Sequence, residues 1–476
     1  MPSKLDSMRG SAILETSLGD VQASFPLEKL AWNCTKNAIV VSQYLADNNQ
    51  PQPSHESDGP VSTLPKGAPR TIQQARQCLM SSALELFQLA AGPSEFIPNL
   101  APGFQYVACL AWLLQFDIFH LVPASGTISY RDLATAASKR TGSAAAVPEA
   151  RLRSIIRMVM TSAVFHEPEP GQVSHSATSA LLARDADVYS WASYLSTRSA
   201  PTALAMATAH ARFTSASTAN NETAYNVAFD TNLPFFDHLA LDPTNTAEFA
   251  GYMRNVTTSE AMDIKHLVNG YEWGELGRGP VVDVGGSTGN AAIALARAYA
   301  ELEIIVQDLP ENANGGRKAA QQANLPEHVL SRIIFQGHDF MQPQPVADGA
   351  VYLLRMILHD WPDHVAVAIL KNLVPVLANR PSARLLIMDT VMPAPGQVPC
   401  SVERVVRVRD MTMMQVFNSH ERDLEQWKAL LLAVDEGLCL RKVIEPFGSA
   451  MSLLEVGMVC AAKEEHFEED MWEISG

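Results

Sequence analysis

The residues PVVDVGGSTGN at positions 280–290 carry the strongest structural signal in the chain. Val281 to Val284 form a short run typical of a buried strand, three glycines follow, and the alanine-rich residues after them predict a helix. Glycine lets the backbone turn tightly and approach a ligand, and the helix N-terminus offers free N–H groups to an anion. Many strand–helix turns that bind nothing also contain glycine, so this loop alone does not establish a site.

An acidic residue at the end of the next apolar run strengthens the case for a nucleoside ligand. The run Ile304–Val306 leads to Asp308, about 20 residues after the glycine loop, where a carboxylate can accept both ribose hydroxyls. Asp308 could also simply cap the following helix. Together the two features favour NAD or S-adenosylmethionine. Asp283 would repel a pyrophosphate but could help hold the amino group of a methionine, which favours the second cofactor.

The segment 280–465 alternates short apolar runs with helical patterns, which predicts an α/β fold with a doubly wound parallel sheet. The runs are PVVDVGG, EIIVQDLP, RIIFQGHDF, AVYLLRMIL and ARLLIMDTV. Ligands of such sheets bind beyond the carboxyl ends of the strands. Asp339 could therefore accept a hydrogen bond from an adenine while Phe340 packs on its ring, although a turn acid and a core phenylalanine explain the pair equally well.

The segment LRMILHDWPDH, residues 354–364, allows three interpretations. His359 can be a general base at the end of a strand, since an unperturbed imidazole titrates near neutral pH. The segment can also be a metal site of a hydrolase, but Ile357 stands where an HxHxDH motif needs a histidine. The third interpretation is a structural cap before Pro362. We expect no metal.

The N-terminal half has a different organisation. Helical patterns cover 26–48 and 71–92, and the Pro-, Ser- and Gly-rich residues 49–70 predict a linker or surface loop. Further helices around 103–119 and 148–163, followed by a hairpin at 163–176, suggest a winged-helix unit. Six basic residues against two acidic ones between 131 and 157 make this unit locally positive, and winged helices often bind DNA.

The composition limits the partners and the compartment. The chain has 476 residues, enough for two or three domains, and a formal net charge of −16. That charge argues against nucleic acid and against an anionic membrane as partners. Six scattered cysteines, no secretory signal and no expected membrane-spanning stretch point to a reduced cytoplasmic protein.

Five motifs together resemble the caffeate-type, cation-independent class of S-adenosylmethionine-dependent O-methyltransferases, and most closely its fungal members that methylate aromatic polyketides and related phenols. The motifs are DVGGSTGN, QDLP, GHDF, LRMILHDWPD and HERDLEQW. The resemblance extends over about residues 25–465 and implies a Rossmann-like catalytic domain with an N-terminal all-α and winged-helix region that forms a homodimer. It implies the following divisions: N-terminal helices 1–100, a dimerisation region 101–185, a helical connector lining the substrate pocket 186–278, the cofactor domain 279–465 and a tail 466–476.

The resemblance also implies roles for individual residues, as follows. S-adenosylmethionine contacts fall on Gly285, Gly286, Asp308, Asp339, Phe340 and Arg355; the general base is His359; its acidic partners are Asp389 and Glu421; Met414 and Asn418 form a substrate-clamping pair.

The expected reaction is proton removal from an acceptor hydroxyl by His359, with attack of the oxyanion on the sulfonium methyl and no metal. Two alternatives remain open at this point. One is a winged-helix DNA-binding regulator with a methyltransferase-like sensor domain, and the other is a metal-dependent hydrolase at HDWPDH.

Overall fold

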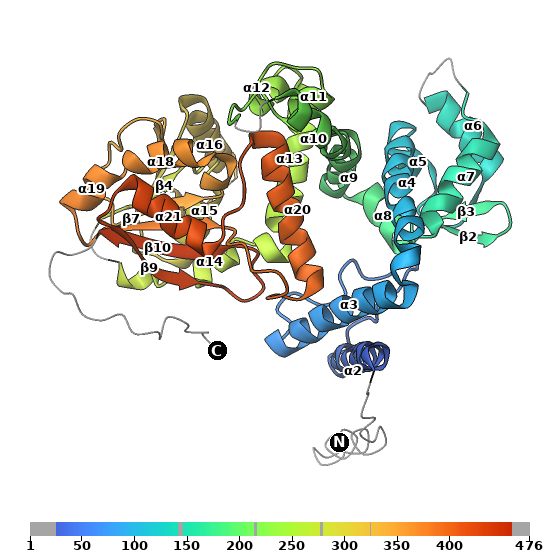
Figure 1. Ribbon diagram of the computed structural model, residues 1–476. Helices are drawn as coiled ribbons and strands as arrows, with labels where there is room; N and C mark the ends of the chain where they lie inside the picture. Colours follow the sequence, from blue (N-terminus) through green and yellow to red (C-terminus); the bar gives the residue numbers. More distant parts are fainter. Residues whose placement is uncertain (1–24, 141–145, 214–216, 277–278, 324, 459–476) are drawn as a thin grey trace, which may run out of the picture. The chain divides into compact units, whose positions relative to one another are not determined.

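The computed structural model describes residues 25–140, 146–213, 217–276, 279–323 and 325–458 (Figure 1). The predicted tail 466–476 and Cys460 lie outside these ranges. The chain forms two compact units. The first consists of residues up to 54, 59–104 and 398–402, and the second of 55–58, 105–397 and the residues from 403 onward. The finer predicted division into four domains stays a prediction.

A seven-stranded sheet with the order β6-β5-β4-β7-β8-β10-β9 forms the centre of the second unit. Its strands are β4 (Val281–Val284), β5 (Ile304–Asp308), β6 (Ile333–Gly337), β7 (Val351–Arg355), β8 (Arg384–Asp389), β9 (Leu438–Ile444) and β10 (Ser452–Met458). The first five pair in parallel, and β10 runs antiparallel between β8 and β9. The five predicted strands are confirmed. β9 and β10 were not predicted. β9 is an edge strand that carries Arg441 and Lys442 and so lacks a continuous apolar run, whereas β10 is mostly buried and its apolar residues are interrupted by Glu455.

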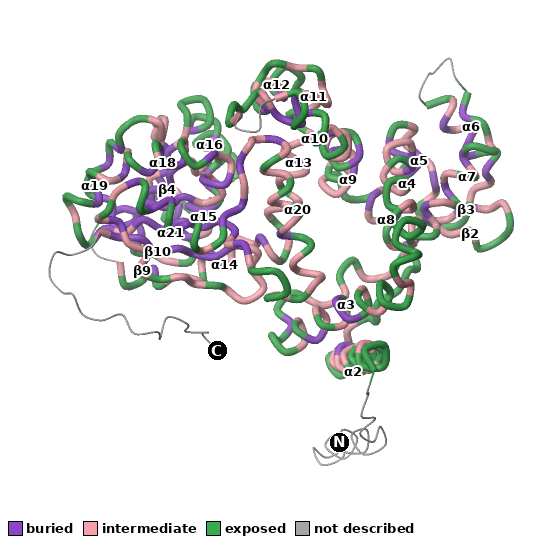
Figure 2. Tube along the Cα trace, in the orientation of Figure 1, coloured by how far each residue is buried: buried purple, intermediate pink, exposed green. Residues whose placement is uncertain are grey.

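Both faces of this sheet are covered by helices, as the predicted doubly wound fold requires. On one face α18 (Asp363–Lys371), α19 (Val374–Asn379) and α21 (Leu424–Val434) pack on the strands, with Trp427 fully buried. On the other face α14 (Lys265–Asn269), α15 (Asn290–Ala298), α16 (Pro310–Gln322) and α17 (Glu327–Leu330) form a second core. Figure 2 shows the strands as the most deeply buried part of the unit.

Before the sheet, the second unit contains a small helical and β region. Its elements are α4 (Phe96–Gln115, shared with the first unit), α5 (Ile118–Leu121), β1 (Ile128–Ser129), α6 (Tyr130–Arg140), α7 (Glu149–Met160), β2 (His166–Glu169), β3 (Gln172–Ser174) and α8 (Ala177–Arg184). The strands form an antiparallel sheet with the order β1-β3-β2. The predicted helix at 148–163 and hairpin at 163–176 are confirmed, while the winged-helix assignment stays a prediction.

The predicted linker 49–70 contains no helix or strand before Arg70, where α3 begins, but part of it is fixed to this region. Glu56 forms an isolated β-bridge with Ser176, and the backbone N–H of Ala177 donates to the carbonyl of His55. These contacts are consistent with the second of the two predictions for 49–70, a surface loop.

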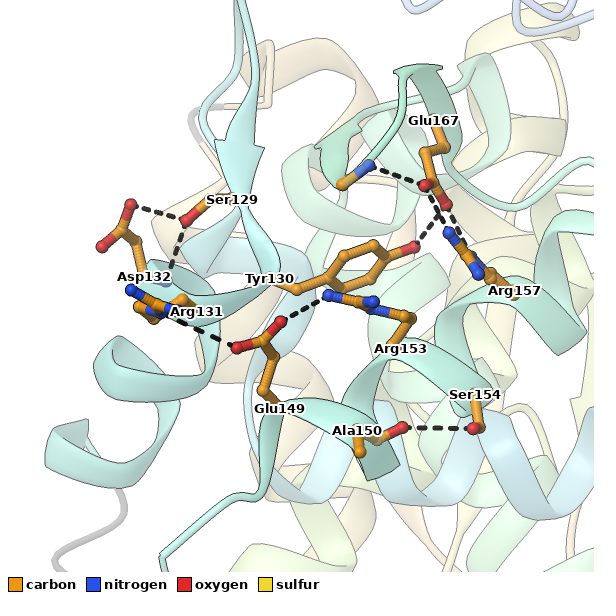
Figure 3. A network of polar contacts seen from close by, with 11 residues as sticks. Ser129, Tyr130, Arg131, Asp132, Glu149, Ala150, Arg153, Ser154, Arg157 and Glu167 are labelled. Carbon is orange, nitrogen blue, oxygen red and sulfur yellow. Dashed lines mark hydrogen bonds and ion pairs between the residues drawn. The ribbon is translucent and has the colours of Figure 1, made fainter.

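Acidic side chains pair with much of the positive charge predicted between residues 131 and 157 (Figure 3). Arg157 donates two hydrogen bonds to Glu167, and this contact lowers the pKa of Glu167 to about 2. Arg153 and Arg131 both pair with Glu149. Three of the arginines are thus paired with acids of the same region, which weakens the main observation in favour of a DNA-binding regulator.

The described residues of the connector 186–278 are mostly helical, as predicted, and lead to the sheet. Its elements are α9 (Ala186–Tyr194), a π-helical turn (Leu195–Ser199), α10 (Ala200–Arg212), α11 (Ala224–Ala228), α12 (Phe235–Ala240), α13 (Pro243–Thr258), η3 (Glu260–Met262), α14 and η4 (Trp273–Glu275). An aromatic cluster joins this connector to the end of α20 (Cys400–Phe417). Its rings include Tyr194, Tyr225, Phe235, Phe249 and Phe417.

In the first unit, α2 (Pro26–Asp47) and α3 (Arg70–Ala91) pack around Val41, Leu45 and Ala75. The helical stretch Pro93–Gln115 that follows is, by length and composition, able to cross a membrane, and it is the one such stretch in the part of the chain that the structure describes. The expectation of no membrane-spanning stretch stays a prediction, because polar residues such as Asn99 and Gln105 interrupt the apolar residues of this helix. A single such helix is weak evidence for a membrane span, since a core helix passes the same test.

Candidate functional site

The glycine loop joins β4 to α15 in a conformation that glycine alone adopts easily. Gly285 and Gly289 have φ values of 77° and 81°. A Cβ on Gly286 would lie 2.5 Å from Oδ2 of Asp283. Side chains at these positions would therefore strain the backbone or fill the space beside the acid. The loop keeps this space open at the carboxyl end of the central strand, where a doubly wound sheet binds its ligand.

Asp308 lies at the end of the neighbouring strand β5 and contacts the same loop. Its carboxylate accepts hydrogen bonds from the backbone N–H groups of Ser287 and Leu309, both at 2.8 Å, and from Asn312. Each carboxylate oxygen can accept more than one hydrogen bond. Asp308 therefore fixes the glycine loop and keeps acceptor capacity for ribose hydroxyls.

Asp283 is a buried acid that the loop leaves without a full set of partners. Its side chain is 2% exposed and its Oδ2 has no hydrogen-bond partner among the described residues. Burial raises the pKa of Asp283 to about 7, against the opposing charge of Arg355. A cationic ligand group beside this carboxylate would relieve that burial penalty. The residues present thus fit a cofactor that carries an amino group and a nucleoside.

The other three residues predicted to contact a cofactor differ in how the structure places them. Phe340 lies beside the loop, 3.7 Å from the Cβ position of Gly285, and packs edge-on against Trp361. Arg355 is at the end of β7 and donates to the carbonyl of Met262. Asp339 accepts from the backbone N–H of Met341, which is a turn contact. The structure therefore brings Phe340 to the loop, while the role of Asp339 stays a prediction.

His359 lies in a 3-10 turn, η5 (Leu358–Asp360), directly after β7. The side chain is buried, and its Nδ1 lies 3.0 Å from Oε1 of Glu421. Its Nε2 lies 3.6 Å from Oδ1 of Asp360, which is beyond hydrogen-bond distance. With Nδ1 held as the donor, Nε2 is the nitrogen that can accept a proton from a ligand.

The two predicted acidic partners of His359 act differently. Glu421 accepts the hydrogen bond from the ring. Asp389, at the end of β8, is fully buried, and neither of its oxygens has a partner in the described structure. Burial raises the pKa of Asp389 to about 7, against the charge of His359. Glu421 therefore orients the ring, whereas Asp389 influences it through charge.

The charges around His359 favour its protonated form. Burial alone would lower its pKa, but the carboxylates of Asp389, Asp360 and Glu421 outweigh this and raise the pKa of His359 to about 9. Burial opposes ionisation of Glu421 as well, yet the contacts with His359 and Arg409 hold its pKa below the usual value. A cationic ligand nearby would lower the pKa of His359 and free its Nε2 as a base.

The predicted substrate-clamping pair lies on α20 and just after it. Met414 is partly exposed on the helix. Asn418 has a φ of 52°, and its Nδ2 donates to the carbonyls of Ala219 at 2.8 Å and Glu222 at 3.1 Å. The amide of Asn418 therefore holds the loop before α11, and its contact with a substrate stays a prediction.

The histidine segment does not assemble as a metal site. His359 is bound to Glu421, while Asp363 is bound to Arg422. Within the described ranges, no group of three His, Cys, Asp or Glu side chains could hold a metal ion.

Sequence reasoning missed two arginines at this site. Arg409 on α20 has its Nε 3.7 Å from Oε1 of Glu421, the atom that also accepts from His359. Arg422 follows Glu421 in the chain and contacts the turn that carries His359. The motif HERD could have indicated the second arginine, because a residue adjacent to Glu421 must lie close to that turn. No comparable signal marks Arg409.

Comparison with known proteins identifies the family and supports the fold. Residues 213–435 match the model of the O-methyltransferase domain family. The chain is 56% identical to the O-methyltransferase pgmB of Aspergillus terreus over 90% of this chain and 96% of that protein. It is 44% identical to the O-methyltransferase aurJ of Gibberella zeae over 93% and 99% of the two chains. Among solved structures, OxaC in complex with sinefungin and meleagrin has a TM-score of 0.66 at 22% identity, over 90% of this chain and 99% of that one.

Proposed function

The chain belongs to the O-methyltransferase family of S-adenosylmethionine-dependent enzymes of fungal secondary metabolism, and on this premise we propose that it methylates a phenolic hydroxyl of an aromatic, polyketide-like small molecule. The observation that carries the proposal is the contact between His359 and Glu421. This contact holds a buried imidazole by its Nδ1 beyond the end of β7, next to the central strand that leads into the glycine loop, which supports a base at this position.

The residues at the ends of the strands would divide the work between cofactor and acceptor. The glycine loop, Asp308 and Asp283 would hold S-adenosylmethionine, with Phe340 beside it. When bound, this cofactor supplies an electrophilic methyl group on a cationic sulfur. His359 takes the acceptor's hydroxyl proton on Nε2, and Glu421 stabilises the imidazolium that forms. Holding both reactants in one geometry supplies much of the acceleration.

The aromatic cluster next to α20 supports an aromatic acceptor. Phe235, Phe236 and Phe417 pack edge-to-face or stacked, and Phe236 remains 53% exposed. Met411 and Met414 are partly exposed on the same helix as Phe417. Flat apolar molecules pack well on such aromatic and thioether groups.

Methyl transfer to a phenol can be measured directly. We expect the purified protein, incubated with methyl-labelled S-adenosylmethionine and a panel of phenolic polyketides, to give a product whose mass has increased by one methyl group. Fragmentation should place the label on oxygen. Transfer to carbon or nitrogen, or acceptance of non-phenolic alcohols in preference to phenols, would refute the proposed acceptor class.

We also propose that the protein forms a homodimer through its N-terminal region. Four large apolar side chains are more than half exposed on α4, which is an unusual amount of apolar surface for a free monomer. They are Phe96, Ile97, Leu100 and Phe104. Light scattering should give twice the 51.8 kDa chain mass, and Ile97→Asp should shift the mass toward one chain. A wild-type mass of one chain at micromolar concentration would disprove this proposal.

A further inference from the structure

Arg422 is fully buried, and the hydrogen bonds that its guanidinium donates all go to one short segment of the chain. Its Nη1 donates to the carbonyl of Leu358 at 2.9 Å, and its Nη2 donates to the carbonyl of Trp361 at 2.8 Å. Its Nε and Nη2 both donate to Oδ1 of Asp363, at 2.9 and 2.7 Å. The guanidinium therefore makes four hydrogen bonds, all of them to residues 358–363.

This segment includes the turn that carries His359. Leu358 begins the turn and Trp361 follows it, so the two lie on either side of His359 in the chain, and Asp363 is the first residue of α18. The guanidinium also packs over the ring of Trp427 on α21, with its Cζ 5.3 Å from the ring centre. Arg422 thus ties the turn to a helix in the core, and it does so from the position next to Glu421.

Three consecutive residues of the HERD motif help to fix His359, each through a different contact. Glu421 accepts from Nδ1 and sets the orientation of the ring. Arg422 holds the backbone on both sides of the ring. Asp423 accepts from the backbone N–H of Gln426 and begins α21, which fixes the motif to the sheet.

We propose that Arg422 is a positioning residue of the methyl transfer, which places Nε2 of His359 by fixing the backbone of η5. This inference rests on the proposed role of His359 as base. Lysine should not replace Arg422, because one ammonium group lacks the planar fork that reaches two carbonyls and a carboxylate together. A shift of the reacting nitrogen by about 1 Å is enough to lower a rate about 100-fold.

The test compares Arg422→Lys with Arg332→Lys. Arg332 is a matched control, because it also donates four hydrogen bonds to backbone carbonyls and lies away from His359, just before the edge strand β6. The carbonyls are those of Ala296, Tyr299, Leu302 and His328. We expect Arg422→Lys to lower kcat about 100-fold, with the acceptor KM and the cofactor Kd within about twofold of wild type. Arg332→Lys should lower the melting temperature and leave kcat unchanged. Equal kcat values in the two variants would overturn the proposal.

A second readout does not depend on activity. In nitrogen-15 histidine spectra, Arg422→Lys should move the His359 ring signals, whereas Arg332→Lys should leave them in place. Unmoved signals would contradict a positioning role. If Arg422→Lys does not fold, Asp363→Ala removes the exposed side-chain acceptor of the same guanidinium, and a wild-type kcat in that variant would count against the proposal. Activity in a His359→Ala variant would instead refute the base itself, so the two failures are distinguishable.

Discussion

Replacing His359 with alanine is expected to lower kcat about 1,000-fold, because general base catalysis by a positioned side chain contributes roughly 100- to 10,000-fold. The imidazole has its Nδ1 engaged with Glu421 and its Nε2 free of a hydrogen bond in the described structure. No other residue of η5 offers a neutral base there. Cofactor affinity should stay within about twofold, since the glycine loop and Asp308 contact each other and not His359.

The matched control for this experiment is His364→Ala. His364 belongs to the same segment but lies exposed on α18. Its removal should leave kcat unchanged, whereas the hydrolase interpretation would require both histidines. Isothermal titration with S-adenosylmethionine and steady-state rates on the two variants separate the outcomes. Near-normal turnover of His359→Ala with intact cofactor binding would refute the assignment of the base.

The parallel part of the sheet was predictable because its central strands are buried on both faces. Strands such as β7 and β8 read as continuous apolar runs, which is the pattern that two covered faces impose. The antiparallel edge was not predictable in the same way. In β9, only Leu438 is buried and the remaining residues are partly or fully exposed, so the sequence has no apolar run to mark it.

The residues that form the site were also largely predictable from the sequence, but which of them form hydrogen bonds with one another was not. Asp389 and Glu421 both appeared as partners of His359, and they lie far apart in the sequence. Which of them bonds to the ring depends on how α21 packs against the sheet, and the structure gives this bond to Glu421. Arg409 and Arg422 have ordinary helical or loop contexts in the sequence. The importance of Arg409 follows from the buried carboxylate of Glu421 that it faces, and that of Arg422 from the carbonyls of Leu358 and Trp361 to which it donates.

The second large effect concerns Glu421. Glu421→Gln is expected to lower kcat about 100-fold, because the ring loses a charge-assisted hydrogen bond and the imidazolium loses its nearest counter-charge. The pH dependence should also change. Glu421 is one of the acids that raise the pKa of His359 to about 9. Removing its negative charge destabilises the protonated ring, so the rise of kcat/KM with pH should occur at lower pH in the variant.

Asp389→Asn is the comparison that separates orientation from charge. This change also removes a negative charge near His359, so it too should move the rise of kcat/KM to lower pH. Asp389 makes no hydrogen bond to the ring, however, and kcat at the plateau should therefore fall only a few-fold. Profiles of kcat and kcat/KM against pH for both variants provide the measurement. If Asp389→Asn lowered the plateau as strongly as Glu421→Gln, the orienting hydrogen bond would not be the source of the rate, and electrostatic stabilisation of the imidazolium by the whole acidic group would be the better account.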